Sequence, residues 1–216
     1  MMQKEEAKEY IVNNGVIAVL RKIPSAYLLK LSETLVNSGV KCLEVTMDTM
    51  EASSAIEMLN KHFNGEALIG AGTVRTAEMA VEAKRAGASF LFSPFLSSEV
   101  LEAGRSLGII TAPGAMTPTE IHEASVLGAD LVKVFPAEVL GSGFIKGVGA
   151  VLGNQLLIPT GGITEKNARD YIRAGAAAVG VGGSLMNVER MESGQYHLIS
   201  NIAKQIAEQV QEAKST

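Results

Sequence analysis

The sequence predicts a single α/β domain over residues 1–216, a (β/α)₈ barrel (TIM barrel) with an extra N-terminal helix. A glycine stands directly before a short apolar run eight times, at intervals of 20 to 26 residues. Segments with helical periodicity precede most of these glycines, and glycine is the usual residue just after a helix. No linker divides the 216 residues, a length that suits one domain. The repeated glycines are Gly15, Gly39, Gly65, Gly87, Gly108, Gly128, Gly153 and Gly175.

The apolar runs are short and nearly continuous, as expected for parallel strands covered on both faces. An open doubly wound sheet is the alternative, but eight regular units and the lack of an early G-x-G-x-x-G favour the barrel. The extra helix is expected over about Gln3–Asn13, before the first strand. The predicted strands are 16–21, 42–47, 68–73, 90–94, 109–113, 131–135, 156–160 and 178–182.

Helix starts are predicted after several strands, where capping residues and early prolines cluster. These signals are Pro24-Ser25, Ser97 to Glu99, Thr117 to Glu120 and Thr164-Glu165.

Composition argues against several classes of protein. The net charge of −4, the absence of Trp and the lack of a basic stripe give nucleic-acid binding little support. The single cysteine, Cys42, excludes an internal disulfide and a Cys-rich metal site, and it fits a reducing cytoplasm. Met1–Tyr10 does not form a signal peptide, and no apolar run is long enough to cross a membrane. The three histidines fall in helical stretches without metal-binding spacing, namely His62, His122 and His197.

Lys133 is the first candidate catalytic residue, because it interrupts the apolar strand 131–135. Alternation places Leu131, Lys133 and Phe135 on one face of that strand. If this face is the barrel interior, desolvation favours the neutral amine, the form that attacks carbonyls. A lysine that extends to the rim, or a structural ion pair, is the alternative.

Glu44 is the second candidate, in the strand 42–47. Both strands are even-numbered, and alternate strands of this fold share interior layers, so Glu44 is expected to face Lys133. A carboxylate beside a Schiff-base lysine transfers protons, directly or through water. A buried salt bridge without chemistry is the alternative, although such pairs contribute little to stability.

Other strand ends carry candidate binding residues, since active sites of such barrels lie at the carboxyl ends of the strands. Arg21 ends the first strand and is a candidate for binding a carboxylate or phosphate. Gly70, Gly72 and Thr73 end the third, where glycines let a ligand approach the backbone. Glycine pairs follow strands seven and eight, where phosphate binds in many barrels, at Gly161-Gly162 and Gly182-Gly183.

The sequence resembles the 2-keto-3-deoxy-6-phosphogluconate / 4-hydroxy-2-oxoglutarate aldolases, which are class I pyruvate aldolases. The similar segments occur in order over nearly the whole chain and are specific when taken together. They are V-L-R (19–21), L-E-V-T (43–46), I-G-A-G-T-V (69–74), S-P (93–94), P-G (113–114), K-V-F-P-A (133–137), P-T-G-G-I (159–163) and G-G-S (182–184).

The resemblance implies a mechanism without metal or cofactor, and a homotrimer. Lys133 would form an imine with C2 of a 2-keto acid, and Glu44 would move protons during cleavage to pyruvate and an aldehyde. Thr73 would hold the pyruvate carboxylate, and Pro94 and Phe135 would line the pocket. The distal phosphate, where the substrate has one, would be held by Gly161, Gly162, Gly183 and Ser184.

One position departs from the resemblance. Some family members carry an arginine that contacts the substrate shortly after the E-V-T segment, and here Asp48 takes that place. Arg21 still matches a family arginine, so we expect Arg21 to carry most of the anion binding, while Asp48 would repel a second anion.

Two other functions stay open from the residues alone. One is a phosphosugar isomerase or epimerase that uses Glu44 as a base and needs no reactive lysine. The other is a non-catalytic barrel that binds a sugar phosphate.

Overall fold

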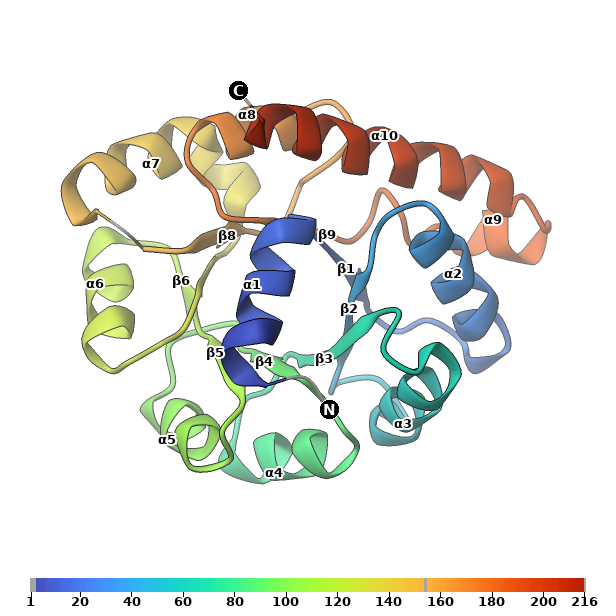
Figure 1. Cartoon of the computed structure of the whole chain (residues 1–216), viewed down its shortest axis with the longest axis horizontal. Coiled ribbons are helices and arrows are strands. Elements are labelled where there is room, and N and C mark those ends of the chain that lie inside the picture. Colours follow the sequence, from blue (N-terminus) through green and yellow to red (C-terminus); the bar gives the residue numbers. More distant parts are fainter. Residues whose placement is uncertain (1–2, 154, 216) are drawn as a thin grey trace.

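The computed structural model describes residues 3–153 and 155–215, so Met1, Met2, Asn154 and Thr216 of the predicted domain lie outside it. Parallel strands surround a central axis and helices cover them on the outside (Figure 1). The strands are β1 (Val16–Leu20), β2 (Cys42–Thr46), β3 (Leu68–Gly72), β4 (Phe90–Phe92), β5 (Ile110–Ala112), β6 (Gly114–Ala115), β7 (Val132–Val134), β8 (Leu157–Pro159) and β9 (Val179–Val181).

Helices alternate with these strands, as the glycine repeat predicts. All eight repeated glycines have a positive φ, between 60° and 103°, which explains why glycine recurs there. The helices are α1 (Lys4–Asn14), α2 (Ser25–Asn37), α3 (Ala52–Phe63), α4 (Ala77–Arg85), α5 (Ser98–Ser106), α6 (Pro118–Val126), α7 (Ala137–Leu152), α8 (Ala168–Arg173), α9 (Val188–Glu192) and α10 (Tyr196–Lys214).

The strands pair in two parallel sheets. One has six strands in the order β5-β4-β3-β2-β1-β9, and the other has three in the order β6-β7-β8. A single parallel bridge between Thr160 and Gly180 links the end of β8 to β9. The fold is therefore α/β with parallel strands, and the six-stranded sheet forms half of a barrel.

Pro113 ends the strand predicted over 109–113. Proline has no N–H for a ladder, so the chain pairs with β4 before Pro113 and with β7 after it. The Pro113 carbonyl still accepts a hydrogen bond from the Lys133 N–H, at 2.9 Å. The predicted strand is therefore observed as β5, which ends before Pro113, and β6 lies beyond the predicted range.

The start of α8 also differs from the sequence prediction. Thr164 and Glu165 lie in a turn, and the helix begins at Ala168. The side chain of Asn167 accepts a hydrogen bond from the Thr164 N–H at 2.8 Å, and Thr164 Oγ1 accepts one from the Lys166 N–H at 3.2 Å. The Thr164 carbonyl also accepts a hydrogen bond from the Ala168 N–H at 3.1 Å, so these local bonds form a turn just before α8.

Alternate residues of the strands point to the central axis and form an interior cluster. Helix α1 covers the amino-terminal end of this interior, because buried Ala7 and Ile11 pack into it (Figure 1). The strand residues of the cluster are Ile17, Cys42, Leu68, Phe90, Phe92, Ile110, Ala112, Leu131, Ile158 and Ala178. The opposite faces of the strands pack against the outer helices in a larger cluster.

Within the described part of the chain, no helix combines the length and the apolar character needed to cross a membrane.

Candidate active site

Lys133 and Glu44 meet inside the ring of strands. Lys133 lies at the centre of β7 and is 6% exposed, and Glu44 lies at the centre of β2 and is fully buried. The distance from Lys133 Nζ to Glu44 Oε1 is 3.4 Å. The two residues face each other as strand alternation predicts. This distance is long for a charged hydrogen bond, so the amine is not locked to the carboxylate.

Aromatic rings enclose the Lys133 amine. Nζ lies 5.7 Å from the ring centre of Phe92 and 5.8 Å from that of Phe135. The second oxygen of Glu44, Oε2, is buried and has no hydrogen-bond partner among the described residues. A buried carboxylate oxygen without a hydrogen-bond partner costs free energy. A ligand that exchanges a proton with this oxygen offsets that cost.

Gly72 provides the space that Glu44 occupies. A Cβ atom on Gly72 would lie 1.8 Å from Glu44 Oε1. Gly70, two residues earlier, leaves room for Phe90 in the same way, because a Cβ there would lie 2.3 Å from that ring. From the sequence, we expected these glycines to let a ligand approach the backbone closely. In the structure, interior side chains occupy the space beside them.

Thr73 and Pro94 follow β3 and β4 at the same end of the strands. Thr73 has a φ of 53°, a rare conformation for a β-branched residue that costs about 1–3 kcal/mol and is typical of functional sites. Pro94 packs against Gly114, where a Cβ would lie 2.4 Å from the Pro94 carbonyl carbon. Neither residue lines the cavity that contains the glycine pairs.

A cavity of about 570 Å³ lies between the ends of β1, β7, β8 and β9. It brings together six of the predicted binding residues: Arg21, Phe135, Gly161, Gly162, Gly183 and Ser184. Lys22 and Glu138 also line it, and the sequence did not single them out. Glu138 is an acidic residue in the first turn of α7, a common position that carries no specific signal.

The glycine pair after β8 lies against an acidic side chain. A Cβ on Gly162 would lie 2.6 Å from Glu138 Oε2, so this carboxylate occupies the space beside the glycine. Gly161 and Gly162 have φ values of 98° and 69°, which glycine adopts without strain. On the β9 side, Ser184 Oγ donates to the Ile163 carbonyl at 3.2 Å.

Arg21 and Asp48 form an ion pair at the mouth. Arg21 Nη2 and Nε lie 2.9 and 3.2 Å from Asp48 Oδ2. Burial would raise the pKa of Asp48, but hydrogen bonds from Thr46 and Arg21, together with the charge of Arg21, outweigh it and lower the pKa. Asp48 is therefore ionised at neutral pH, and the predicted anion-binding arginine already has an anionic partner.

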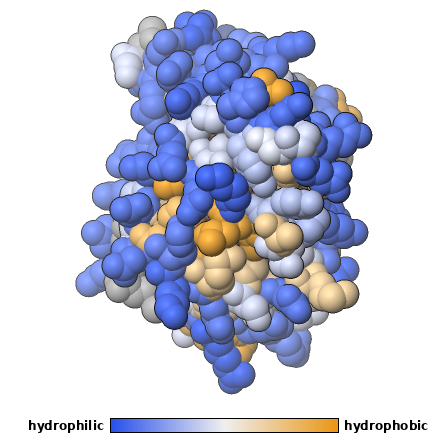
Figure 2. Space-filling view, turned by 90° about the vertical axis from the view of Figure 1, so that its right-hand side faces the viewer, coloured by the Kyte–Doolittle hydropathy of each residue, from blue (hydrophilic) through white to orange (hydrophobic). Residues whose placement is uncertain are grey.

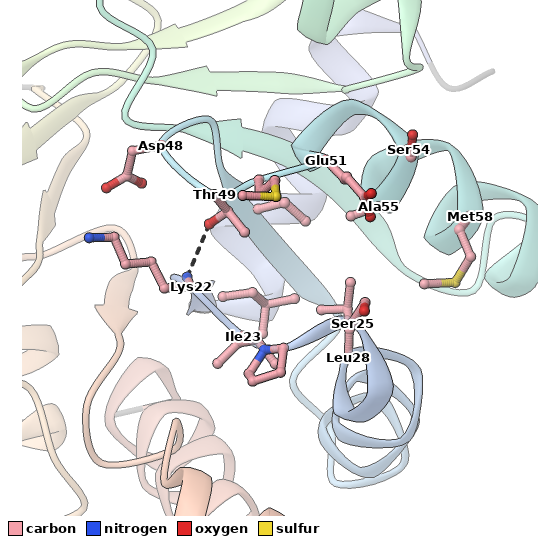
Figure 3. A pocket seen from close by; sticks show the side chains of 14 residues that line it. Lys22, Ile23, Ser25, Leu28, Asp48, Thr49, Glu51, Ser54, Ala55 and Met58 are labelled. Carbon is pink, nitrogen blue, oxygen red and sulfur yellow. Dashed lines mark hydrogen bonds between the residues drawn. The ribbon is translucent and has the colours of Figure 1, made fainter.

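A second hollow of about 720 Å³ lies between α2 and α3, outside the strands. Figure 2 shows apolar side chains gathered in the middle of this otherwise hydrophilic face. In the close view of Figure 3, Lys22 and Asp48 lie at the edge of the hollow, while Leu28 and Met58 lie deeper along α2 and α3. Lys22 and Asp48 thus separate this hollow from the mouth.

Across residues 3–153 and 155–215, no group of three or more His, Cys, Asp or Glu side chains is placed to hold a metal ion.

Enzymes that attack a carbonyl with an amine need an enclosed lysine beside a proton-transferring group, and the fold and the site define an enzyme of this class. The family described as KDPG and KHG aldolase matches residues 8–202. The chain belongs to this family, and it is an aldolase, a lyase that cleaves carbon–carbon bonds.

Relatives and solved structures agree with this assignment. The chain is 34% identical to the KHG/KDPG aldolase of Escherichia coli (strain K12), over 95% of this chain and 96% of the relative. It is 31% identical to the 2-dehydro-3-deoxy-phosphogluconate aldolase of Treponema pallidum (strain Nichols), over 88% and 89%. The KDPG aldolase of Legionella pneumophila, solved with pyruvate captured as a covalent carbinolamine, superposes with a TM-score of 0.85 at 32% identity, over 93% and 97%.

Proposed function

We propose that this chain cleaves 2-keto-3-deoxy-6-phosphogluconate, 4-hydroxy-2-oxoglutarate or both, through a Schiff base on Lys133. The products are pyruvate and an aldehyde, glyceraldehyde 3-phosphate or glyoxylate. The observation that carries the proposal is the buried amine of Lys133, 3.4 Å from a buried carboxylate oxygen of Glu44. The names of the relatives support the choice of substrates.

The reaction begins when the neutral amine of Lys133 attacks C2 of the 2-keto acid. Loss of water gives an iminium ion, and Glu44 supplies and removes the protons that this step needs. Glu44, directly or through water, then takes the proton of the C4 hydroxyl. The C3–C4 bond breaks and the aldehyde leaves. The electron pair of the broken bond moves into the iminium ion and gives an enamine. Protonation at C3 and hydrolysis release pyruvate and restore Lys133.

We propose the binding roles that the family resemblance implies. Thr73 holds the pyruvate carboxylate at the end of β3, while Pro94 and Phe135 line the pocket around the reacting carbons. Gly161, Gly162, Gly183 and Ser184 hold the distal group in the cavity of about 570 Å³. Arg21 contributes positive charge beside them. No metal or cofactor takes part in this scheme.

Reductive trapping tests the proposal. The protein incubated with pyruvate and borohydride is expected to gain the mass of one reduced pyruvate adduct, located on Lys133 by peptide mapping. Release of pyruvate from 2-keto-3-deoxy-6-phosphogluconate measures turnover. An isomerase or epimerase that uses Glu44 as a base gives no adduct, and a binding barrel gives no pyruvate.

Replacing the lysine gives the first prediction. Lys133→Met keeps the apolar stem and removes the amine, so we expect pyruvate release to fall below detection and the adduct to disappear. The fold should stay intact, but the thermal unfolding temperature should fall, because the buried Glu44 carboxylate loses its ion-pair partner. Substantial turnover by Lys133→Met would refute the assignment.

We also propose that the strands close into one eight-stranded (β/α)₈ barrel, with β5 and β6 as one strand interrupted at Pro113. The Thr160–Gly180 bridge between the two sheets supports closure, and α1 then forms an extra helix below it. Residues 1–216 form a single domain in this proposal.

Assembly as a homotrimer is supported by the family resemblance and by the apolar side chains of the hollow between α2 and α3, where Met50 is 90% exposed. The mass of the protein in solution, measured by light scattering, tests this. A cytoplasmic location is supported by the unpaired Cys42. A small 2-keto acid is the partner, and we propose no nucleic-acid or membrane partner.

A further inference from the structure

The ion pair of Arg21 and Asp48 lies where a substrate must enter. Arg21 follows β1, which pairs with β2 on one side and with β9 on the other. Asp48 lies on the β2 side, and the glycine pair with Ser184 lies on the β9 side. Nε and Nη2 of Arg21 both donate to one oxygen of Asp48, so the guanidinium that lines the cavity has its charge paired with a carboxylate.

The turn that carries Asp48 is well fixed. The Thr49 N–H donates to the Thr46 carbonyl at 2.9 Å, and the hydroxyls of Thr46 and Thr49 lie 3.1 Å apart. Thr49 Oγ1 also accepts a hydrogen bond from the Lys22 N–H at 3.0 Å, drawn as the dashed line in Figure 3. Asp48 is the better buried partner, with its side chain 18% exposed against 59% for Arg21. The arginine therefore adapts to the aspartate.

Asp48 also has a free acceptor. Its Oδ1 atom is buried and has no hydrogen-bond partner within residues 3–153 and 155–215. An ionised oxygen in such a place is poorly satisfied, and a hydroxyl donor satisfies it better than an anion does.

The charges around the site balance. Arg21, Lys22 and Glu138 line the cavity. Asp48 pairs with Arg21, and Glu44 pairs with Lys133 nearby, so three cationic side chains are matched by three carboxylates. A substrate with a carboxylate and a phosphate brings a large negative charge into surroundings without a net positive charge. Such a ligand is favoured less than one with a single carboxylate.

We propose that Asp48 is a specificity-determining residue that pairs with Arg21 and offsets its charge at the cavity. The site then favours a 2-keto-3-deoxy acid whose distal end is uncharged and carries hydroxyls, over its phosphorylated counterpart. This inference rests on the proposed aldolase function and names the substrate class of the same site.

The test compares two substrates that differ only by the phosphate, 2-keto-3-deoxy-6-phosphogluconate and 2-keto-3-deoxygluconate. For the unchanged protein we expect kcat/KM of the phosphorylated compound to be no greater than that of the other. In Asp48→Asn the freed guanidinium should raise the ratio of phosphorylated to unphosphorylated kcat/KM by about tenfold, since one charge of the pair is removed. Salt should reduce the gain, because it screens charges at an open mouth.

Glu51→Gln is the matched control. Glu51 belongs to the same loop, lines the same hollow between α2 and α3 and loses the same charge, but the ion pair with Arg21 belongs to Asp48. We expect this variant to change the ratio less than twofold. If Asp48→Asn is unstable, Asp48→Ser removes the same charge and serves in its place.

The possible failures are distinguishable. A protein that gives no borohydride adduct with pyruvate contradicts the proposed function itself. A protein that forms the adduct and cleaves both substrates, but whose ratio stays within twofold or falls in Asp48→Asn, overturns only the role of Asp48. An equal gain in Glu51→Gln overturns it as well, because general charge would then explain the effect.

Discussion

Single residues decide whether the two proposed catalytic groups meet, and Gly72 shows this most directly. Its missing side chain is the space in which the Glu44 carboxylate lies, 3.4 Å from the amine of Lys133. Alternation along β2 and β7 made this pair predictable from the sequence. The role of Gly72 was not predictable, because it depends on the register of β2 and β3, where Thr46 pairs with Gly72.

Gly72→Ala is therefore expected to damage catalysis out of proportion to its size. The new methyl group displaces Glu44, and we expect kcat to fall by about a hundredfold or more, as for loss of a proton-transferring group. The cost in free energy of unfolding should be about 1–3 kcal/mol, typical of overpacking. Steady-state kinetics and urea unfolding measure the two effects.

Glu44→Gln provides the comparison for that variant. It keeps the shape of the side chain and removes the proton acceptor, so its kcat should fall by a similar factor of about 10²–10⁴. If Gly72→Ala instead keeps normal kcat, the position of Glu44 is not what limits the reaction.

The contacts of Asp48 and Glu138 at the mouth could not be predicted from the sequence. Asp48 was noted as a departure from the family pattern, but its pairing with Arg21 depends on the turn Thr46–Thr49. Glu138 was overlooked because its closeness to Gly162 depends on how α7 leaves β7. Side chains on strands follow a fixed period, whereas those on loops do not, and this difference separates the predicted from the unpredicted residues.

At the scale of elements, capping residues predicted helix starts well where one cap was available. Ser97 and Thr117 accept hydrogen bonds from the N–H groups of Val100 and Glu120, each at 3.3 Å. Prediction failed where two caps competed, as Thr164 and Asn167 do before α8. The change of pairing partner at Pro113 was not predicted either, because sequence alone does not show which neighbour the chain pairs with on each side of it.

Helix α7 offers a contrast between two of its glycines. Gly141 has a φ of 72° at a kink, whereas Gly147 is exposed and a Cβ there meets nothing within 4 Å. Gly147→Ala should raise the free energy of unfolding by about 0.5–1 kcal/mol, because it removes freedom from the unfolded chain. Gly141→Ala should lower it by about 1–2 kcal/mol, the cost of a left-handed alanine. Chemical denaturation measures the free energy of unfolding of both variants. Equal changes in the two would contradict the kink at Gly141.

Across the whole molecule, α1 closes the end of the interior opposite the catalytic mouth. Burial raises the pKa of the Cys42 thiol, so the reactive thiolate is scarce in the folded protein. Ile11→Ala, in α1, should cost about 2–5 kcal/mol of stability and speed the reaction of Cys42 with a thiol reagent. The rate of labelling under native conditions is the measurement.

Leu59→Ala is the control for this prediction. Leu59 is also fully buried, but it belongs to α3 and packs in the outer cluster. It should destabilise the protein comparably and expose Cys42 less. Equal labelling rates at equal loss of stability would show that α1 has no special part in closing the interior.

The contacts of α1 with the other end of the chain have a consequence for biosynthesis. Gln211 donates to the carbonyls of Asn13 and Asn14 at 3.0 and 2.9 Å, and Lys214 donates to that of Val12. Helix α1 therefore finds these partners only after α10, far along the chain, has been synthesised. Until then the nascent chain lacks the contacts that hold α1 over the end of its strands, and their apolar side chains are less well covered.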